Sequence, residues 1–239
     1  MQWRNRSPAL RSAASQTVIR RSLVAFLFFW ASAARSYSQD TQSWNELDLA
    51  THYGRVDVLI PLVARFETTQ ATPQLSAVGV MADLPLASHL TITAGYLLVV
   101  LEPQSTIVHV PLIAFTGSMI WRRMRLGDRN RFETLFDHGN SPTRYRNRLS
   151  ADLLLAASGR WHIFADDEIF FKVNDLSWNQ NRFRAGIGKA MGRRLWLDGF
   201  YLQKNPSGAS PIHVVGATLR VAINGGSNVL KGATDHGRN

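Results

Sequence analysis

The chain has 239 residues, no cysteine and a formal net charge of +10. A chain of this length fits one domain, and all-β barrels commonly reach this size undivided. The lack of cysteine excludes a disulfide framework, a zinc-thiolate site and a cysteine nucleophile. The charge is uneven, because residues 1–38 hold six arginines and no acid, which leaves 21 basic against 17 acidic residues in the remainder. Once this leader is set aside, the composition gives little support to nucleic-acid binding.

Residues 1–38 have the organisation of a secretory signal peptide. A basic region ends at Arg20-Arg21, the apolar core LVAFLFFWASAA follows, and small residues then stand at Ala31-Ser32-Ala33 and at Ser36-Tyr37-Ser38. This order predicts export and cleavage, with a mature start near Gln39. The core is shorter than the roughly 20 apolar residues of a transmembrane helix. An uncleaved amphipathic anchor and an over-extended start ahead of a shorter signal are the alternative interpretations.

Short extended runs separated by turn residues fill residues 39–224, the predicted barrel domain, and no stretch of comparable length has a helical period. In chain order the runs are 44–53, 55–67, 74–84, 90–101, 106–121, 128–136, 143–155, 161–172, 178–188, 194–204 and 213–223. Pro111 lies within one run and predicts a bulge or a break in the hydrogen-bond ladder. Residues 225–239 are polar and are expected to form either a tail or a short last strand.

Alternating strands with short turns fit either a soluble barrel or sandwich, or a transmembrane barrel. A soluble barrel fills its interior with the apolar face, whereas a membrane barrel turns that face to lipid. Aromatic residues, many of them near the ends of the runs, are typical of the girdles at membrane interfaces. They are Trp44, Tyr53, Phe66, Tyr96, Trp121, Trp161, Phe171, Trp178, Trp196 and Tyr201. Together with the signal peptide, they favour a transmembrane barrel with a polar, charged lumen.

Charged residues alternate most regularly between Thr143 and Gly188. In an extended chain this spacing puts polar groups on one face and mostly apolar groups on the other. We expect one polar cluster in the lumen, made of Arg129, Arg131, Glu133, Arg144, Arg146, Arg148, Asp166, Glu168, Gln180, Arg182 and Arg184. Carboxylates and arginines on adjacent strands are expected to form ion pairs that close the wall. Alternatively, the arginines favour small anionic solutes in a pore.

Several short motifs occur in the order seen in one bacterial family. They are Trp44 with NELDL, then PLASHLTITAGYL, RNRFE, RYRNRL, ADDEIFF, NQNR and LDGFYLQ. From about Trp44 to Leu202 the chain resembles the family known as domain of unknown function 2490. The resemblance implies an outer-membrane β-barrel of a Gram-negative bacterium and implies no activity. In place of the family's Glu-His-Arg run this chain has only His109, so the resemblance implies that one lumen charge pair is missing.

Bacterial single-chain barrels close with an even number of strands, so the eleven runs predict an antiparallel up-and-down barrel of about 12 strands, with 10 as the alternative. We expect a structural or passive-transport role in contact with the lipid bilayer. Two alternatives remain open, an outer-membrane lipid-modifying enzyme and a soluble periplasmic barrel that binds a small ligand.

Enzymatic activity has one weak candidate arrangement. Ser150 and His162 fall on neighbouring predicted strands with Asp152 close in sequence, as a nucleophile, a base and an acid would require. The seven histidines lack metal-ligand spacing, so the sequence predicts no metal site and no cofactor. Most such histidines are wall or loop residues, and the sequence favours a protein that is not an enzyme.

Overall fold

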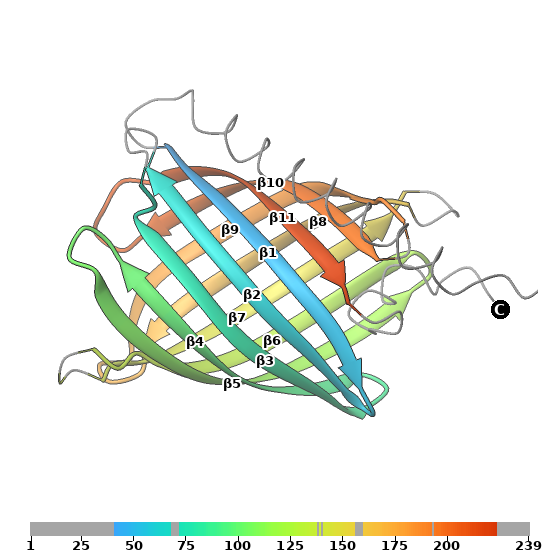
Figure 1. Ribbon diagram of the computed structural model, residues 1–239, viewed down its shortest axis with the longest axis horizontal. Coiled ribbons are helices and arrows are strands. Elements are labelled where there is room, and N and C mark those ends of the chain that lie inside the picture. The colour runs from blue at the N-terminus through green and yellow to red at the C-terminus, as the bar shows by residue number, and fades with distance from the viewer. Residues whose placement is uncertain are drawn as a thin grey trace, which may run out of the picture. The chain divides into compact units, whose positions relative to one another are not determined.

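The computed structural model describes residues 41–67, 72–137, 139, 141–155, 160–192 and 194–223. In these residues eleven strands form one closed barrel (Figure 1). The strands are β1 (Thr41–Tyr53), β2 (Val56–Glu67), β3 (Leu75–Ala87), β4 (Leu90–Leu101), β5 (Thr106–Trp121), β6 (Met124–Thr134), β7 (Thr143–Leu154), β8 (Trp161–Lys172), β9 (Ser177–Ala190), β10 (Leu195–Pro206) and β11 (Ile212–Ala222). The predicted all-β barrel is confirmed. Nothing in the described ranges forms a helix long and apolar enough to cross a membrane.

The barrel closes through one parallel pair. Consecutive strands pair antiparallel, whereas β1 and β11 run in the same direction, from Thr41 opposite His213 to Ala50 opposite Ala222. An odd number of alternating strands leaves the first and last parallel, so only this pairing closes the sheet. Within the described residues the barrel has eleven strands, between the predicted 10 and 12, and the eleven runs correspond to them. The predicted signal peptide and the segment 225–239 lie outside the described residues.

Pro111 marks a gap between β5 and β6. The ladder between these strands ends at Leu112 opposite Glu133, and an isolated bridge in the same register joins His109 to Phe136. The pair that would place Pro111 opposite Thr134 is missing, because proline has no N–H to donate. On its other side Pro111 keeps its place in the ladder, opposite Tyr96. The predicted break in the ladder is confirmed on one edge of β5.

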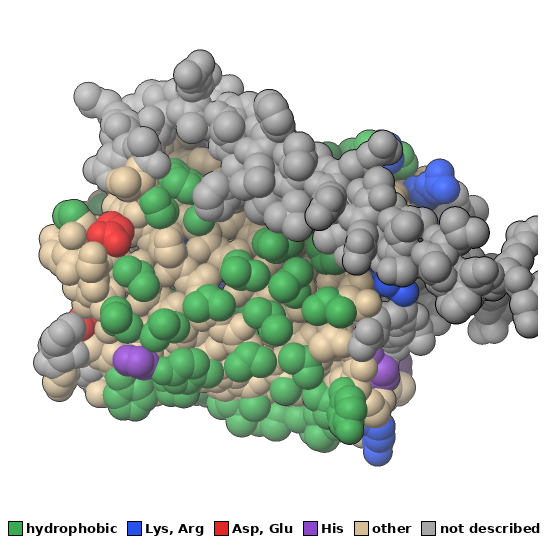
Figure 2. Space-filling view, viewed as in Figure 1, with side chains coloured by type: hydrophobic (Ala, Val, Ile, Leu, Met, Phe, Trp, Pro, Cys, Tyr) green, Lys and Arg blue, Asp and Glu red, His purple; other side chains and the backbone are tan. Residues whose placement is uncertain are grey.

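Successive side chains alternate between the lumen and the outside, and the outward set is largely apolar on β2 to β5. On β6 to β9 the outward set also includes mid-strand polar residues, which are Asp128, Asn130, Asn147, Asp167 and Asn181. Figure 2 shows hydrophobic side chains spread over the face made by the first strands, while the charged side chains visible there lie toward the ends of the barrel. Large outward residues in mid-strand keep much of their surface uncovered, including Val80 at 48% and Phe115 at 41% exposed. Soluble monomers rarely expose apolar surface so continuously.

The tryptophans divide between the two faces. Trp121, Trp161 and Trp178 are exposed on the outside near strand ends, as expected of an interface girdle. Trp44 and Trp196 instead point into the lumen and are 9% and 2% exposed, so their prediction as girdle residues is wrong. Their neighbours explain the difference. Trp44 packs with Phe200, Leu202 and Val214, whereas Trp196 packs with Ala190 and Ala222.

Candidate functional site

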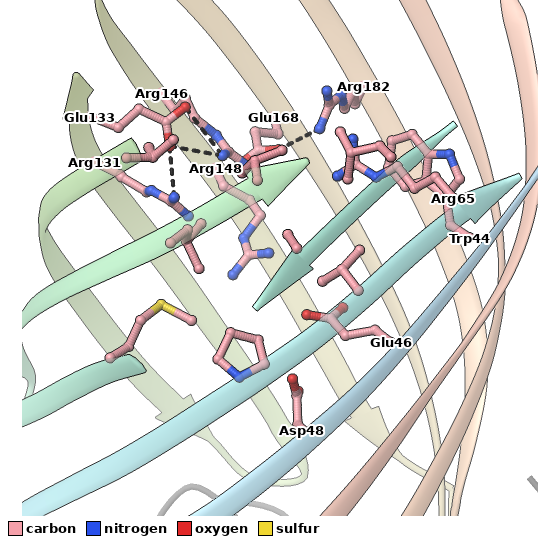
Figure 3. A pocket seen from close by; sticks show the side chains of 18 of the residues that line it. Trp44, Glu46, Asp48, Arg65, Arg131, Glu133, Arg146, Arg148, Glu168 and Arg182 are labelled. Atoms are coloured by element: carbon pink, nitrogen blue, oxygen red, sulfur yellow. Dashed lines mark hydrogen bonds and ion pairs between the residues drawn. The ribbon is translucent and has the colours of Figure 1, made fainter. Parts of the chain in front are cut away.

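A cavity of about 580 Å³ lies in the barrel lumen (Figure 3) and has two chemically different walls. One, here called the apolar wall, comes from β2 to β5 and consists of Leu59, Pro61, Val63, Leu75, Ala77, Met81, Leu97, Val99, Leu101, Val108 and Val110. The rest of the lining carries nine arginines, Arg65, Arg129, Arg131, Arg144, Arg146, Arg148, Arg182, Arg184 and Arg220. Five carboxylates accompany them, Glu46, Asp48, Glu133, Asp166 and Glu168. The ionisable lining therefore has a surplus of four positive charges.

Glu133 on β6 gathers three of the guanidinium groups. Glu133 is 1% exposed; its carboxylate forms an ion pair with Arg131 Nη2 at 2.7 Å and accepts a hydrogen bond from Arg146 Nη1 at 3.2 Å. Arg144 donates to the Oε1 atom of the same carboxylate. Register produces this convergence, because Arg144 lies directly opposite Glu133 and Arg146 lies opposite Arg131.

Arg146 links Glu133 to a second carboxylate, Glu168 on β8. Its Nε and Nη2 atoms donate to Glu168 Oε1 at 3.1 and 2.7 Å, and Arg182 Nη1 lies 3.9 Å from Glu168 Oε2. The guanidinium carbons of Arg146 and Arg182 also lie 4.6 and 4.4 Å from the centre of the Phe170 ring. The ring face carries partial negative charge and stabilises cations in this position. On this part of the wall four guanidinium groups therefore share two carboxylates.

Arg184 and Arg220 are also paired. Arg184 donates from Nε and Nη2 to Asp166 Oδ2 at 2.8 and 2.7 Å. Arg220 lies between two carboxylates, with Nη2 3.0 Å from Asp198 Oδ2 and Nε 3.4 Å from Asp48 Oδ2. These contacts fix the arginine side chains by charge-assisted hydrogen bonds.

Arg65, Arg129 and Arg148 are the lining arginines that form no ion pair within the described residues. Among the described residues, none of the three has a carboxylate oxygen within 4.0 Å of its guanidinium nitrogens. The Nε atoms of Arg65 and Arg129 are buried without a hydrogen-bond partner. Arg65 is held instead over Trp44, with its guanidinium carbon 3.9 Å from the ring centre. Arg129 and Arg148 lie directly opposite one another on β6 and β7.

All eleven members of the predicted polar cluster occupy lumen-facing positions of β6 to β9. Ten line the cavity, and Gln180 is 5% exposed on the same face of β9. The structure brings this set together around the cavity from four consecutive strands. His109 lies on the opposite, outward face of β5, where its Nδ1 atom meets the Tyr96 hydroxyl.

Ser150 and His162 do not meet. Ser150 lies opposite Asp166 and donates to the Gly127 carbonyl at 3.3 Å, whereas His162 lies opposite Leu154. Four residues along a strand span roughly 13 Å, which is beyond hydrogen-bond reach. His162 Nε2 instead lies 3.6 Å from Asp152 Oδ2 and 3.4 Å from Asp198 Oδ1. The described residues hold no group of three His, Cys, Asp or Glu that could bind a metal ion.

A family model matches the part of the chain that forms β1 to β10. The model described as Protein of unknown function (DUF2490) matches residues 41–211, well over half of the chain. The chain belongs to this family. The DUF2490 match begins with β1 and ends one residue before β11. No curated protein matches the chain.

Among solved structures, this DUF2490 chain is similar to three outer-membrane proteins and porins. An anion-selective porin from Comamonas acidovorans is 10% identical, with a TM-score of 0.37 over 71% of this chain and 55% of the porin. The NanC porin is 11% identical, with a TM-score of 0.48 over 70% of this chain and 83% of NanC. A loop L8 deletion mutant of OmpT, an outer membrane protein of Vibrio cholerae, is 9% identical, with a TM-score of 0.41 over 66% of this chain and 59% of OmpT. The chain spans little more than half of the Comamonas porin.

The sequence reasoning missed two parts of the DUF2490 lumen. Arg65 and Arg220 join the lining from β2 and β11, far in sequence from the other arginines. The alternation of Asp57, Arg65 and Glu67 on one face of β2 was a signal for the first of them. The apolar wall gave no such signal, because β2 to β5 carry apolar residues on both faces.

Proposed function

We propose that this DUF2490 protein is a barrel of the Gram-negative outer membrane that passively admits small anionic solutes. Two features support the membrane setting, the apolar outer face of the first strands and the interface tryptophans Trp121, Trp161 and Trp178. The leader in residues 1–38 has the sequence of an export signal, and its cleavage near Gln39 is part of the proposal.

The surplus of arginine over carboxylate around the cavity is the observation that carries anion uptake. Nine guanidinium groups face five carboxylates, and rings of arginine favour anions in pores. The field acts in a narrow space with low-dielectric walls, where it is stronger than on an open surface.

A purely structural lumen would need a different charge balance. Ion pairing explains Arg131, Arg144 and Arg146, which contact Glu133. It leaves Arg65, Arg129 and Arg148 without carboxylate partners among the described residues. Burying such charges is costly unless something compensates them. An anion in the cavity would compensate them, so these three arginines favour the transport version over the structural one.

Planar-bilayer recording of the purified protein in a KCl gradient tests this function. We expect conductance, and we expect the reversal potential to be displaced from zero toward the equilibrium potential of chloride. The double variant Arg129→Gln/Arg148→Gln halves the surplus of lining charge from four to two and should move the reversal potential toward zero. Arg55→Gln, in the exposed turn between β1 and β2, is the matched control. Absence of conductance, or cation preference, contradicts the proposal.

A further inference from the structure

The apolar wall is continuous and borders the charged lining directly. Cross-strand register places Ala77, Val99 and Val108 side by side on β3, β4 and β5, and places Leu97 next to Val110 in the following row. One edge of this surface meets the charges of β6 without a polar transition, since Arg131 lies directly opposite Ala114 on β5. The cavity is therefore amphipathic, with a hydrocarbon surface on one side and guanidinium groups on the other.

An inorganic anion would use only half of this cavity. Apolar surface in contact with water costs roughly 25 cal/mol per Å² relative to apolar surface that is covered. Several members of the apolar wall, such as Met81, Leu97 and Val99, are only partly buried by the protein. A ligand that covers them gains affinity that chloride or phosphate does not.

The charged side offers one position for an anionic head group. Arg129 and Arg148 lie opposite one another on neighbouring strands, and like charges in this position destabilise a sheet. Arg131 and Arg146, the next pair along, both contact Glu133, whereas Arg129 and Arg148 form no ion pair in the described part of the chain, although Arg148 also lies directly opposite Glu168 on β8. Figure 3 shows the Arg148 side chain extending into the cavity. Two guanidinium groups on directly opposite residues can together bind the oxygens of one carboxylate or phosphate.

We propose that the cavity binds an amphiphilic anion, with its head group between Arg129 and Arg148 and its hydrocarbon chain along the apolar wall. This inference rests on the proposed uptake of anions and names the class of anion. A volume of about 580 Å³ falls within the range of small-molecule sites, roughly 300–1,000 Å³. A free fatty acid and a single-chain phospholipid both present this chemistry.

Calorimetric titration with a homologous series tests the proposal on the unaltered protein. The protein is placed in nanodiscs of zwitterionic lipid and titrated with alkanoates from acetate to decanoate, with empty nanodiscs as reference. We expect the dissociation constant to fall about threefold to fourfold for each added methylene that reaches the apolar wall. Neutral alkanols of the same lengths should bind much more weakly, because they give the arginines no charge to compensate.

Two variants separate the head site from the apolar wall. Arg129→Gln/Arg148→Gln should weaken every alkanoate by a similar factor, on the order of tenfold. Val99→Thr/Val108→Thr, nearly equal in shape to the original pair, should flatten the dependence on chain length. Arg55→Gln is the control for loss of one exposed arginine. Alkyl phosphates titrated in parallel identify which amphiphile supplies the head group. Tighter binding of alkyl phosphates than of alkanoates indicates a phospholipid, and the reverse indicates a fatty acid.

Failure of this inference and failure of the proposed function give different results. Equal binding of acetate and decanoate, or equal binding of alkanoates and alkanols, overturns the amphiphile site and leaves anion-selective conductance intact. Absence of anion-selective conductance together with chain-length-dependent binding overturns passive uptake of small anions and leaves the binding site.

Discussion

Glu133 is the residue on which the charged side of the lumen depends most. Three guanidinium groups contact its buried carboxylate, and one of them, that of Arg146, also contacts Glu168. Removing one partner from such a group leaves the remaining charges uncompensated, and that penalty exceeds the net contribution of any one pair. The network is therefore asymmetric, because loss of the carboxylate affects three arginines and loss of one arginine affects a single contact at Glu133.

Glu133→Gln should lower the free energy of unfolding by about 3 kcal/mol. The amide keeps the shape of the side chain and removes the charge that Arg131, Arg144 and Arg146 share. Urea titration of the refolded barrel, followed by tryptophan fluorescence, measures the loss. Glu67→Gln on β2 is the control, since Glu67 accepts a hydrogen bond from the neutral side chain of Gln74 at 2.6 Å.

A second substitution distinguishes the shared charge from simple damage to packing. In Glu133→Gln/Arg144→Gln one positive charge leaves together with the negative one. We expect the double variant to be more stable than the sum of the two single effects predicts, by about 0.5–3 kcal/mol. Strict additivity would contradict the network.

At the scale of strands, the sequence predicts charged faces better than apolar ones. In β6 to β9 the lumen positions carry charge at every second residue, whereas the outward positions mix apolar residues such as Tyr145 with uncharged polar ones such as Asn147, so the period of the charges identifies the face. In β4 the run LLVVL has no alternation, and Leu97 and Val99 in the lumen cannot be told from Leu98 and Val100 outside. Periodicity reports a difference between two faces, and here the faces are alike.

The number of strands in the barrel is set by the pairing of its first and last strands, which are distant in sequence. The eleven runs are visible locally because turn residues separate them, whereas the parallel pairing of Thr41 to Ala50 with His213 to Ala222 joins the two ends of the barrel. No local signal in either segment specifies the direction of a partner so distant in sequence. The rule of even strand number predicts 12 or 10, on either side of the eleven strands observed in the described residues.

The parallel seam requires a small residue at Gly216 on β11. A Cβ atom there would overlap the Phe200 ring and lie 2.6 Å from the Trp44 carbonyl oxygen on β1. Gly216→Ala should therefore reduce stability by about 1–3 kcal/mol, because the aromatic cluster or the seam must shift. The loss is measured as the temperature at which prior heating removes the band of the folded barrel from a gel that is run cold. Gly199→Ala on β10 is the matched control, since a Cβ there meets nothing within 4 Å, and equal loss in both variants would contradict a specific role for the seam.

At the scale of the whole molecule, the sheet is oriented in the opposite way to that of a soluble barrel, in which the apolar face fills the interior. The arginines of β6 to β9 gather inside the barrel with most of their carboxylates, and large apolar residues remain uncovered outside (Figure 2). In water this arrangement would leave much apolar surface exposed, whereas in a bilayer the outer face is in its preferred solvent. The alternative interpretation is a soluble periplasmic barrel. It predicts that a charge placed on the outer face leaves stability almost unchanged, whereas a membrane barrel predicts a loss of stability.

Val80→Arg separates a membrane barrel from a soluble one. Val80 lies near the middle of β3 on the outer face and is 48% exposed. An arginine near the bilayer midplane costs about 2–4 kcal/mol, whereas an exposed surface substitution in water usually changes stability by less than about 0.5 kcal/mol. Guanidinium titration of the protein in lipid vesicles measures the difference. Leu176→Arg, at an 83% exposed position in the turn between β8 and β9, should be close to neutral in either setting. A neutral Val80→Arg in vesicles would place β3 outside the hydrocarbon region and remove the physical basis of the membrane assignment.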